Sequence, residues 1–146
     1  MVHPHDLWHD PWTIRILALA RGLQQRGHQV QLVHLPRKNP PRHGFLREPQ
    51  PGDPPCQALR PRQHHIVSNF RLLRELAEPC GLIHLQKCFA ATALPLLWIS
   101  RTLRKPLHYD WDDNETAIAR QVEKRGLSRL QVAVYERVLP HFAHTL

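Results

Sequence analysis

Short apolar runs alternate with helical stripes along the chain, and this alternation limits its fold more than any other feature. The apolar runs cover residues 30–35, 82–85 and 107–109, and each follows a segment whose apolar residues recur at helical spacing. A helix that returns the chain to the start of the next strand makes neighbouring strands parallel. The sequence therefore predicts the α/β class, with a doubly wound parallel sheet in a single domain over residues 1–146.

The first helix has sequence signals at both ends. Asp10 suits an N-cap and Pro11 suits the first helical position, while Gly27 is typical of the residue just past a helix. The residues that should face the core between these signals are Ile16, Leu19, Ala20 and Leu23. Further helices are expected at residues 66–76, at 90–103 with a break or bend near Pro95, at 115–125 and at 128–142.

A proline-rich, basic segment interrupts the pattern at about residues 36–62. Eight of the 14 prolines fall between Pro36 and Pro61, and arginines and one lysine accompany them. Proline disrupts helices and cannot donate to the ladder of a central strand. We therefore expect a long basic loop without regular structure.

The overall charge favours anionic partners. Lys and Arg number 20 against 12 Asp and Glu, which gives a formal net charge of +8. Nucleic acid, anionic lipid and phosphorylated metabolites are all compatible with this charge, and so is a solvated basic surface without a partner. The three cysteines form no CxxC pair, and no signal peptide is visible. We expect reduced thiols in a cytoplasmic protein that is soluble or peripheral at the inner membrane face.

An acidic run follows the last predicted strand. Four carboxylates lie within six residues, namely Asp110, Asp112, Asp113 and Glu115. Clustered carboxylates raise one another's pKa, so a fold that keeps them together is expected to bind a cation, a sugar hydroxyl or a basic side chain. Trp111 adds a flat apolar face of the kind that stacks on sugars. The alternative is that an Asp or Asn114 only caps the helix that follows.

Two further groups of residues lie near the N-terminus. His3 and His5 have a spacing that can bind zinc, but no later His or Cys group completes such a site, so we expect no metal. Thr13 and Arg15 lie beside the start of the first helix, where free N–H groups and the helix dipole attract phosphate.

Three segments, in order, resemble the N-terminal domain of family 4 (group 1) glycosyltransferases. The first contains Ala20, Leu23 and the run Arg26-Gly27-His28-Gln29-Val30. The second is Leu82-Ile83-His84-Leu85-Gln86-Lys87. The third runs from Arg104-Lys105-Pro106-Leu107 to Tyr109-Asp110-Trp111-Asp112-Asp113-Asn114-Glu115.

This resemblance implies a Rossmann-like domain, the N-terminal half of a GT-B fold, which mainly holds the acceptor. The implied reaction is transfer of a sugar from a nucleotide-sugar to an acceptor with retention, without a metal or a cofactor. The C-terminal nucleotide-sugar domain is not within these 146 residues, so a separate domain or subunit is an expected partner, and the residues are expected to be inactive alone. Asp112 and Asp113 are the expected catalytic residues. The expected substrate-binding residues are Thr13, Arg15, Lys87, Asp110, Trp111 and Glu115.

Two other functions remain compatible with the sequence. A basic Rossmann-like module without catalytic activity could dock on an anionic membrane or on another subunit. A zinc-dependent hydrolase fragment using His3 and His5 is the second alternative. No nucleic-acid partner is expected.

Overall fold

The computed structural model describes residues 1–10, 13–36, 50–60, 66–87, 89–111, 114, 117–118, 121 and 127–142. Contacts divide the chain into two compact units, Met1–Leu72 and Leu73–Leu146, and the division falls inside helix α2 (Ile66–Ala77). Each unit combines parallel strands with helices, which confirms the α/β class. None of the helices within the described ranges is long and apolar enough to cross a membrane.

The first unit contains three parallel strands, β1 (Val2–His3), β2 (Leu32–His34) and β3 (Cys56–Ala58). Strand β2 pairs with both others, with Val33 opposite Val2 and also opposite Gln57. Strand β3 lies within the segment expected to lack regular structure, so that expectation is wrong there. The prolines beside β3 are compatible with it because an edge strand pairs on one side only. The carbonyl of Pro55 still accepts the N–H of Leu32 at 2.8 Å.

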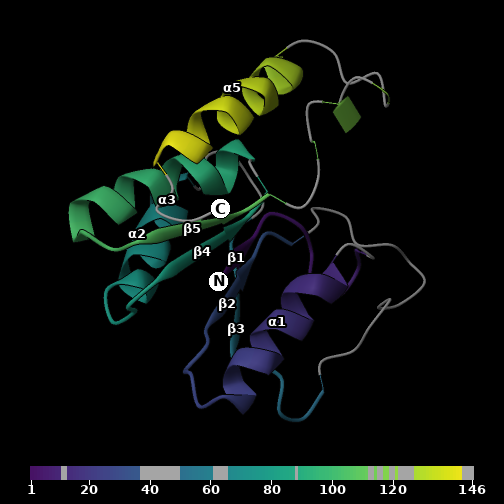
Figure 1. Ribbon diagram of the computed structural model, residues 1–146, viewed down its shortest axis with the longest axis vertical. Coiled ribbons are helices and arrows are strands. Elements are labelled where there is room, and N and C mark those ends of the chain that lie inside the picture. The colour runs from purple at the N-terminus through teal and green to yellow at the C-terminus, as the bar shows by residue number, and fades with distance from the viewer. Residues whose placement is uncertain are drawn as a thin grey trace. The chain divides into compact units, whose positions relative to one another are not determined.

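Helix α1 (Ile14–Gln25) packs against the strands of the first unit (Figure 1). Its buried residues join Leu7 and Leu32 in one apolar cluster, namely Ile16, Leu17 and Ala20. Leu19, expected in the core, is 39% exposed. The predicted end at Gly27 is confirmed, because Gly27 has a φ of +84° and donates to the carbonyl of Gln24 at 2.9 Å.

The predicted start of α1 is wrong. The helix begins at Ile14 after Thr13, and Asp10 caps a different part of the backbone. An Asp10 carboxylate oxygen accepts the N–H of Asp6 at 3.0 Å, so this side chain closes the loop after β1 instead. The cap-forming residue Asp10 therefore belongs to the turn before the helix and not to the start of the helix itself.

The second unit contains β4 (Ile83–Gln86) and β5 (Leu107–Asp110), paired in parallel with Gln86 opposite Asp110. Helix α3 (Ala90–Leu103) contacts both strands, and α5 (Leu127–Phe142) lies beside α3 (Figure 1). Leu85, Leu96, Ile99, Leu107 and Tyr109 are fully buried and form the centre of this unit's core. Helix α3 continues through Pro95 as one helix, so the expected break is absent.

His34, at the end of β2, is held in its neutral form by its surroundings. Its Nδ1 accepts the backbone N–H of Leu7 at 3.2 Å, which requires that this nitrogen carries no proton. Burial lowers the pKa of His34 below its usual 6.5, and the charge of His9 lowers it further, while the Asp6 carboxylate opposes them. The unfolded chain therefore binds a proton at this residue more readily than the folded chain does.

We predict that His34 makes the protein less stable as the pH falls below about 6.5. The pKa of His34 is lower in the folded state than in the unfolded state. Below the unfolded pKa, protons bind the unfolded chain more than the folded chain, and the free energy of unfolding therefore falls as the pH falls. Urea unfolding between about pH 7.5 and about pH 5.5 measures this change. His34→Asn, whose amide oxygen can still accept from Leu7, should show a smaller loss of unfolding free energy on acidification. The control is His28→Asn at an exposed position, which should keep the native dependence. An equal dependence in all three proteins would contradict the prediction.

Candidate functional site

Two polar side chains follow the paired strands of the second unit. Lys87 comes directly after β4 and Trp111 directly after β5, and the parallel register brings these positions to the same edge. The backbone N–H of Lys87 donates to the carbonyl of Asp110 at 3.4 Å. Lys87 is 5% exposed and Asp110 is 6% exposed, so an ammonium and a carboxylate are both withdrawn from solvent in this region.

Lys87 also has an unusual backbone. Its φ is +64°, a left-handed conformation that costs a residue other than glycine about 1–3 kcal/mol. Such strained residues concentrate at functional sites, because the surrounding structure holds them for a purpose other than stability. This observation supports Lys87 as a site residue independently of the sequence motif.

Trp111 is fixed by helix α5. Its indole Nε1–H donates to the Oε1 of Glu136 at 3.1 Å, and Glu136 is only 7% exposed. The ring itself is 49% exposed, so one part is held while another faces solvent. Beside it is a hollow of about 430 Å³, lined by Trp111, Asn114, Ala117, Glu136, Arg137, Pro140 and His141. An aromatic surface, an amide, a carboxylate and two basic groups thus surround one concave space.

Asn114 performs the capping role that the sequence left open between several residues. Its Oδ1 accepts the N–H of Ala117 at 2.8 Å, and its carbonyl accepts the N–H of Ile118 at 3.0 Å. Asn114 therefore makes hydrogen bonds to the N–H groups of Ala117 and Ile118 that are typical of a helix N-cap. Asp112 and Asp113 lie outside the described residues, so both their capping role and their site role stay predictions.

Polar side chains also lie in a row on one face of β4 and β5. His84 lies opposite His108, and their Nδ1 atoms are 2.7 Å apart. One of these nitrogens must carry a proton and the other must not, because two N–H groups cannot face each other at this distance. The Nε2 of His84 lies 3.8 Å from an Asp110 carboxylate oxygen. Asp110, His84 and His108 thus form a continuous polar row that leads away from the strand ends.

The loop after β1 in the first unit contains a separate group of hydrogen-bonded polar side chains. The Oδ1 of Asp6 accepts the N–H of Trp8 at 3.0 Å and lies 3.0 Å from the Nδ1 of His9. The Thr13 hydroxyl contacts the carbonyls of Leu7 and Asp10 at 3.0 and 2.9 Å. Thr13 is buried, so its hydroxyl serves this loop in the structure, while Arg15 is exposed.

The metal expectation concerns the same loop. The rings of His3 and His5 lie 5.4 Å apart between centroids. Within the described ranges, no three or more His, Cys, Asp or Glu side chains are grouped so as to hold a metal ion. Cys56 and Cys80 are free thiols, and burial, together with Asp6 and Asp53, raises the pKa of Cys56 to about 11.

The sequence-derived site residues are thus distributed unevenly. Lys87, Asp110 and Trp111 meet at the strand ends of the second unit. Thr13 and Arg15 belong to the first unit. Asp112, Asp113 and Glu115 lie outside the described residues.

Glu136 is the residue that sequence reasoning missed. It lies on the stripe of α5 that also contains the buried residues Val132 and Leu139. Spacings of four and three residues put all three on one helix face. A carboxylate in the middle of an apolar stripe could have indicated a buried polar contact in the sequence, because burial of such a group requires a partner.

The structure thus shows an α/β protein with a polar hollow, lined in part by Trp111, beside the carboxyl end of β5. Comparison with protein-family models, with curated proteins and with solved structures found no match. The assignment of a function therefore depends on the residues and their geometry.

We predict that the indole hydrogen bond stabilises the second unit. Trp111→Phe removes the donor to the buried carboxylate of Glu136 and should lower the free energy of unfolding by about 1–2 kcal/mol. Trp98→Phe is the matched control, because Trp98 is 64% exposed on α3, and it should change stability by less than about 0.5 kcal/mol. Urea unfolding compares the two, and equal losses would show that the Trp111 contact contributes nothing specific.

Proposed function

We propose that this chain is the acceptor-side, N-terminal domain of a retaining glycosyltransferase of the two-domain GT-B type. In this proposal a nucleotide-sugar donates the sugar, and a further domain or subunit holds the nucleotide. The hollow beside Trp111 carries the proposal, because it combines the side chains that bind sugars at the strand end where α/β proteins bind ligands.

The chemistry of the hollow suits a hydroxylated acceptor. The exposed part of the Trp111 ring offers an apolar surface for the C–H face of a sugar ring. The Glu136 carboxylate can accept hydrogen bonds from hydroxyl groups, and the Arg137 guanidinium can donate them. The hollow of about 430 Å³ is within the size range of small-molecule sites.

The residues expected from the sequence to act in catalysis and binding have proposed roles in the reaction. Sugar transfer develops positive charge on the sugar and negative charge on the departing diphosphate. Asp112 and Asp113 are proposed to stabilise the former or to hold the acceptor, with Asp110 and Glu115 as further contacts. Lys87 and Arg15 are proposed to offset phosphate charge, and Thr13 is a further proposed contact. No group of described residues supports the zinc hydrolase alternative.

A fusion protein tests this proposal. The 146 residues are joined to the nucleotide-sugar domain of a family 4 glycosyltransferase, and transfer from a panel of nucleotide-sugars is measured. We expect turnover from the fusion and none from the 146 residues alone, because half a cleft cannot align donor and acceptor. In an active fusion, Asp113→Asn should lower turnover roughly 10²-fold or more, because it removes a charge that stabilises the transition state.

The same substitution separates catalysis from capping. Asparagine caps a helix about as well as aspartate does, so Asp113→Asn should cost less than about 1 kcal/mol of stability even if Asp113 is a cap. Glu78→Gln, which removes an exposed carboxylate on the Arg74 ion pair, is the control and should leave turnover unchanged. If Asp112→Asn and Asp113→Asn both keep full turnover, neither residue has the proposed role.

A further inference from the structure

Helix α3 has an exposed face that changes from apolar to basic along its length. Leu94 and Trp98 lie one turn apart and are 52% and 64% exposed. Arg101 continues the same face at a spacing of three residues, Arg104 follows directly after the helix end, and both are exposed. The opposite face carries the buried residues Ala93, Leu96 and Ile99, so the exposed tryptophan is not needed for the core.

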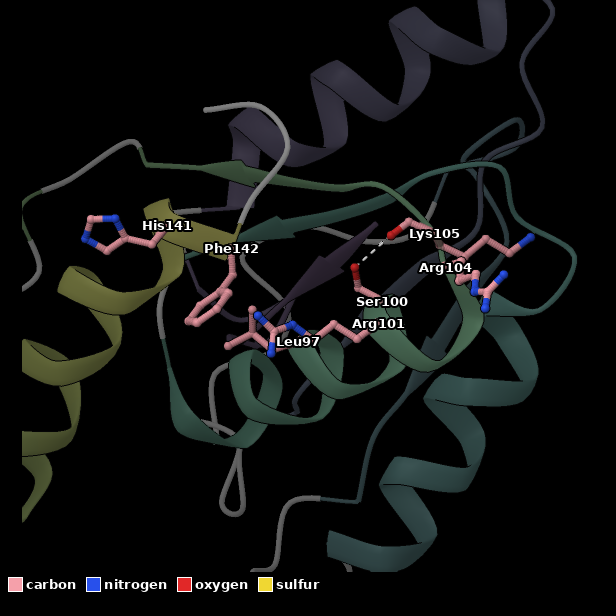
Figure 2. Close-up of a pocket in the computed structure, with 7 residues that line it drawn as sticks. All are labelled: Leu97, Ser100, Arg101, Arg104, Lys105, His141 and Phe142. Carbon is pink, nitrogen blue, oxygen red and sulfur yellow. Dashed lines mark hydrogen bonds between the residues drawn. The ribbon is translucent and has the colours of Figure 1, made fainter.

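The basic end of this face borders a hollow of about 420 Å³ (Figure 2). The residues that line it are Leu97, Ser100, Arg101, Arg104, Lys105, His141 and Phe142. The Arg101 guanidinium carbon lies 4.1 Å from the centre of the Phe142 ring. Figure 2 shows the side chains of Arg104 and Lys105 on the other side of Ser100, so the positive groups are spread along a rim.

The end of α3 does not require these positive side chains. The carbonyl of Ser100 accepts the N–H of Lys105 at 2.9 Å, and the carbonyl of Arg101 accepts the N–H of Arg104 at 3.3 Å. Backbone groups thus satisfy the last carbonyls, as in a Schellman motif. In the described part of the chain, no carboxylate pairs with Arg101, Arg104 or Lys105, and none lines the hollow.

Arg104 occupies a position where glycine would be the more stable choice. Its φ of 51° is left-handed, and glycine is the usual residue at this place after a helix. The chain instead carries a long cation there, at the edge of the basic hollow. Stability therefore does not account for the choice of arginine.

We propose that this face of α3, from Leu94 to Lys105, docks on the surface of an anionic lipid bilayer. Trp98 and Leu94 would enter the interfacial region, which favours amphipathic aromatic rings. Arg101, Arg104 and Lys105 would lie against the negative headgroups, where each cation contributes to binding. The charge of the rim, with no carboxylate among its described residues, fits an anionic surface and not a neutral one. Such docking goes beyond the proposed glycosyl transfer and does not require it.

Co-sedimentation with vesicles tests the basic part of the face. The probes are vesicles of phosphatidylcholine alone and vesicles that contain about one third phosphatidylserine. The full chain should bind the anionic vesicles and lose affinity as salt rises. Arg104→Gly with Lys105→Gln should lower the partition coefficient about 25-fold, at roughly fivefold per cation. Arg104→Gly by itself should unfold at the same or a higher urea concentration, which excludes misfolding as the cause of the loss.

Matched variants remove the same charge and apolar area elsewhere. Arg26→Gln with Arg71→Gln removes two exposed cations, one directly after α1 and one in α2, and should lower binding less than threefold, because neither belongs to the proposed face. Leu94→Ser with Trp98→Ser should reduce binding at least tenfold. Ile14→Ser with Val67→Ser, at positions 70% and 60% exposed, should not. Equal losses from the two charge pairs would overturn the proposal, because the overall charge or the basic segment at 36–62 would then account for binding.

A free anion or a second copy of the chain could occupy this face instead, and each would give a different experimental result. If inorganic phosphate displaces the chain from vesicles while chloride at equal ionic strength does not, the hollow is a site for a free anion and the bilayer proposal fails. If sedimentation shows a dimer that Leu94→Ser with Trp98→Ser dissociates, a second copy of the chain covers the face and the proposal also fails. A monomer whose vesicle binding depends on α3 is the result that supports it.

Discussion

The parallel register of β4 and β5 is the constraint on which the candidate site depends. Gln86 lies opposite Asp110, so the next residue of each strand emerges at the same edge. Lys87 and Trp111 therefore lie at the same edge of the sheet, although they are 24 positions apart in the chain. A shift of one residue in either strand would send these side chains to the opposite face. The buried residues Leu85, Leu107 and Tyr109 oppose such a shift, because it would expose them.

Regular elements with strong periodicity were predictable from the sequence. The helices at Ile66–Ala77, Ala90–Leu103 and Leu127–Phe142 and the strands β2, β4 and β5 lie within a few residues of the predicted ranges. Two of the differences from the predicted elements have clear physical causes. Asp10 and Pro11 predict a helix start, but Asp10 uses its carboxylate to close a turn. The prolines near β3 argued against a strand, yet an edge strand needs partners on one side only.

The site was predictable only in part. The sequence motif placed Lys87, Asp110 and Trp111 after strands, and the parallel pairing brings them together. It did not identify Glu136, whose role depends on how α5 packs against the end of β5. It also did not identify the contact between His84 and His108, because the pairing register of two strands is a tertiary property. Periodicity thus determined the elements, while contacts between elements determined the hollow.

NMR of the indole N–H groups tests the proposal that the hollow beside Trp111 holds a sugar. Methyl glycosides are titrated to millimolar concentrations into the ¹⁵N-labelled chain, and Trp98 serves as the internal reference because it lines neither hollow. We expect at least one glycoside to shift the Trp111 resonance in a saturable manner while the Trp98 resonance stays in place. If no glycoside moves the Trp111 resonance, or if both resonances move together, the hollow is not a sugar site.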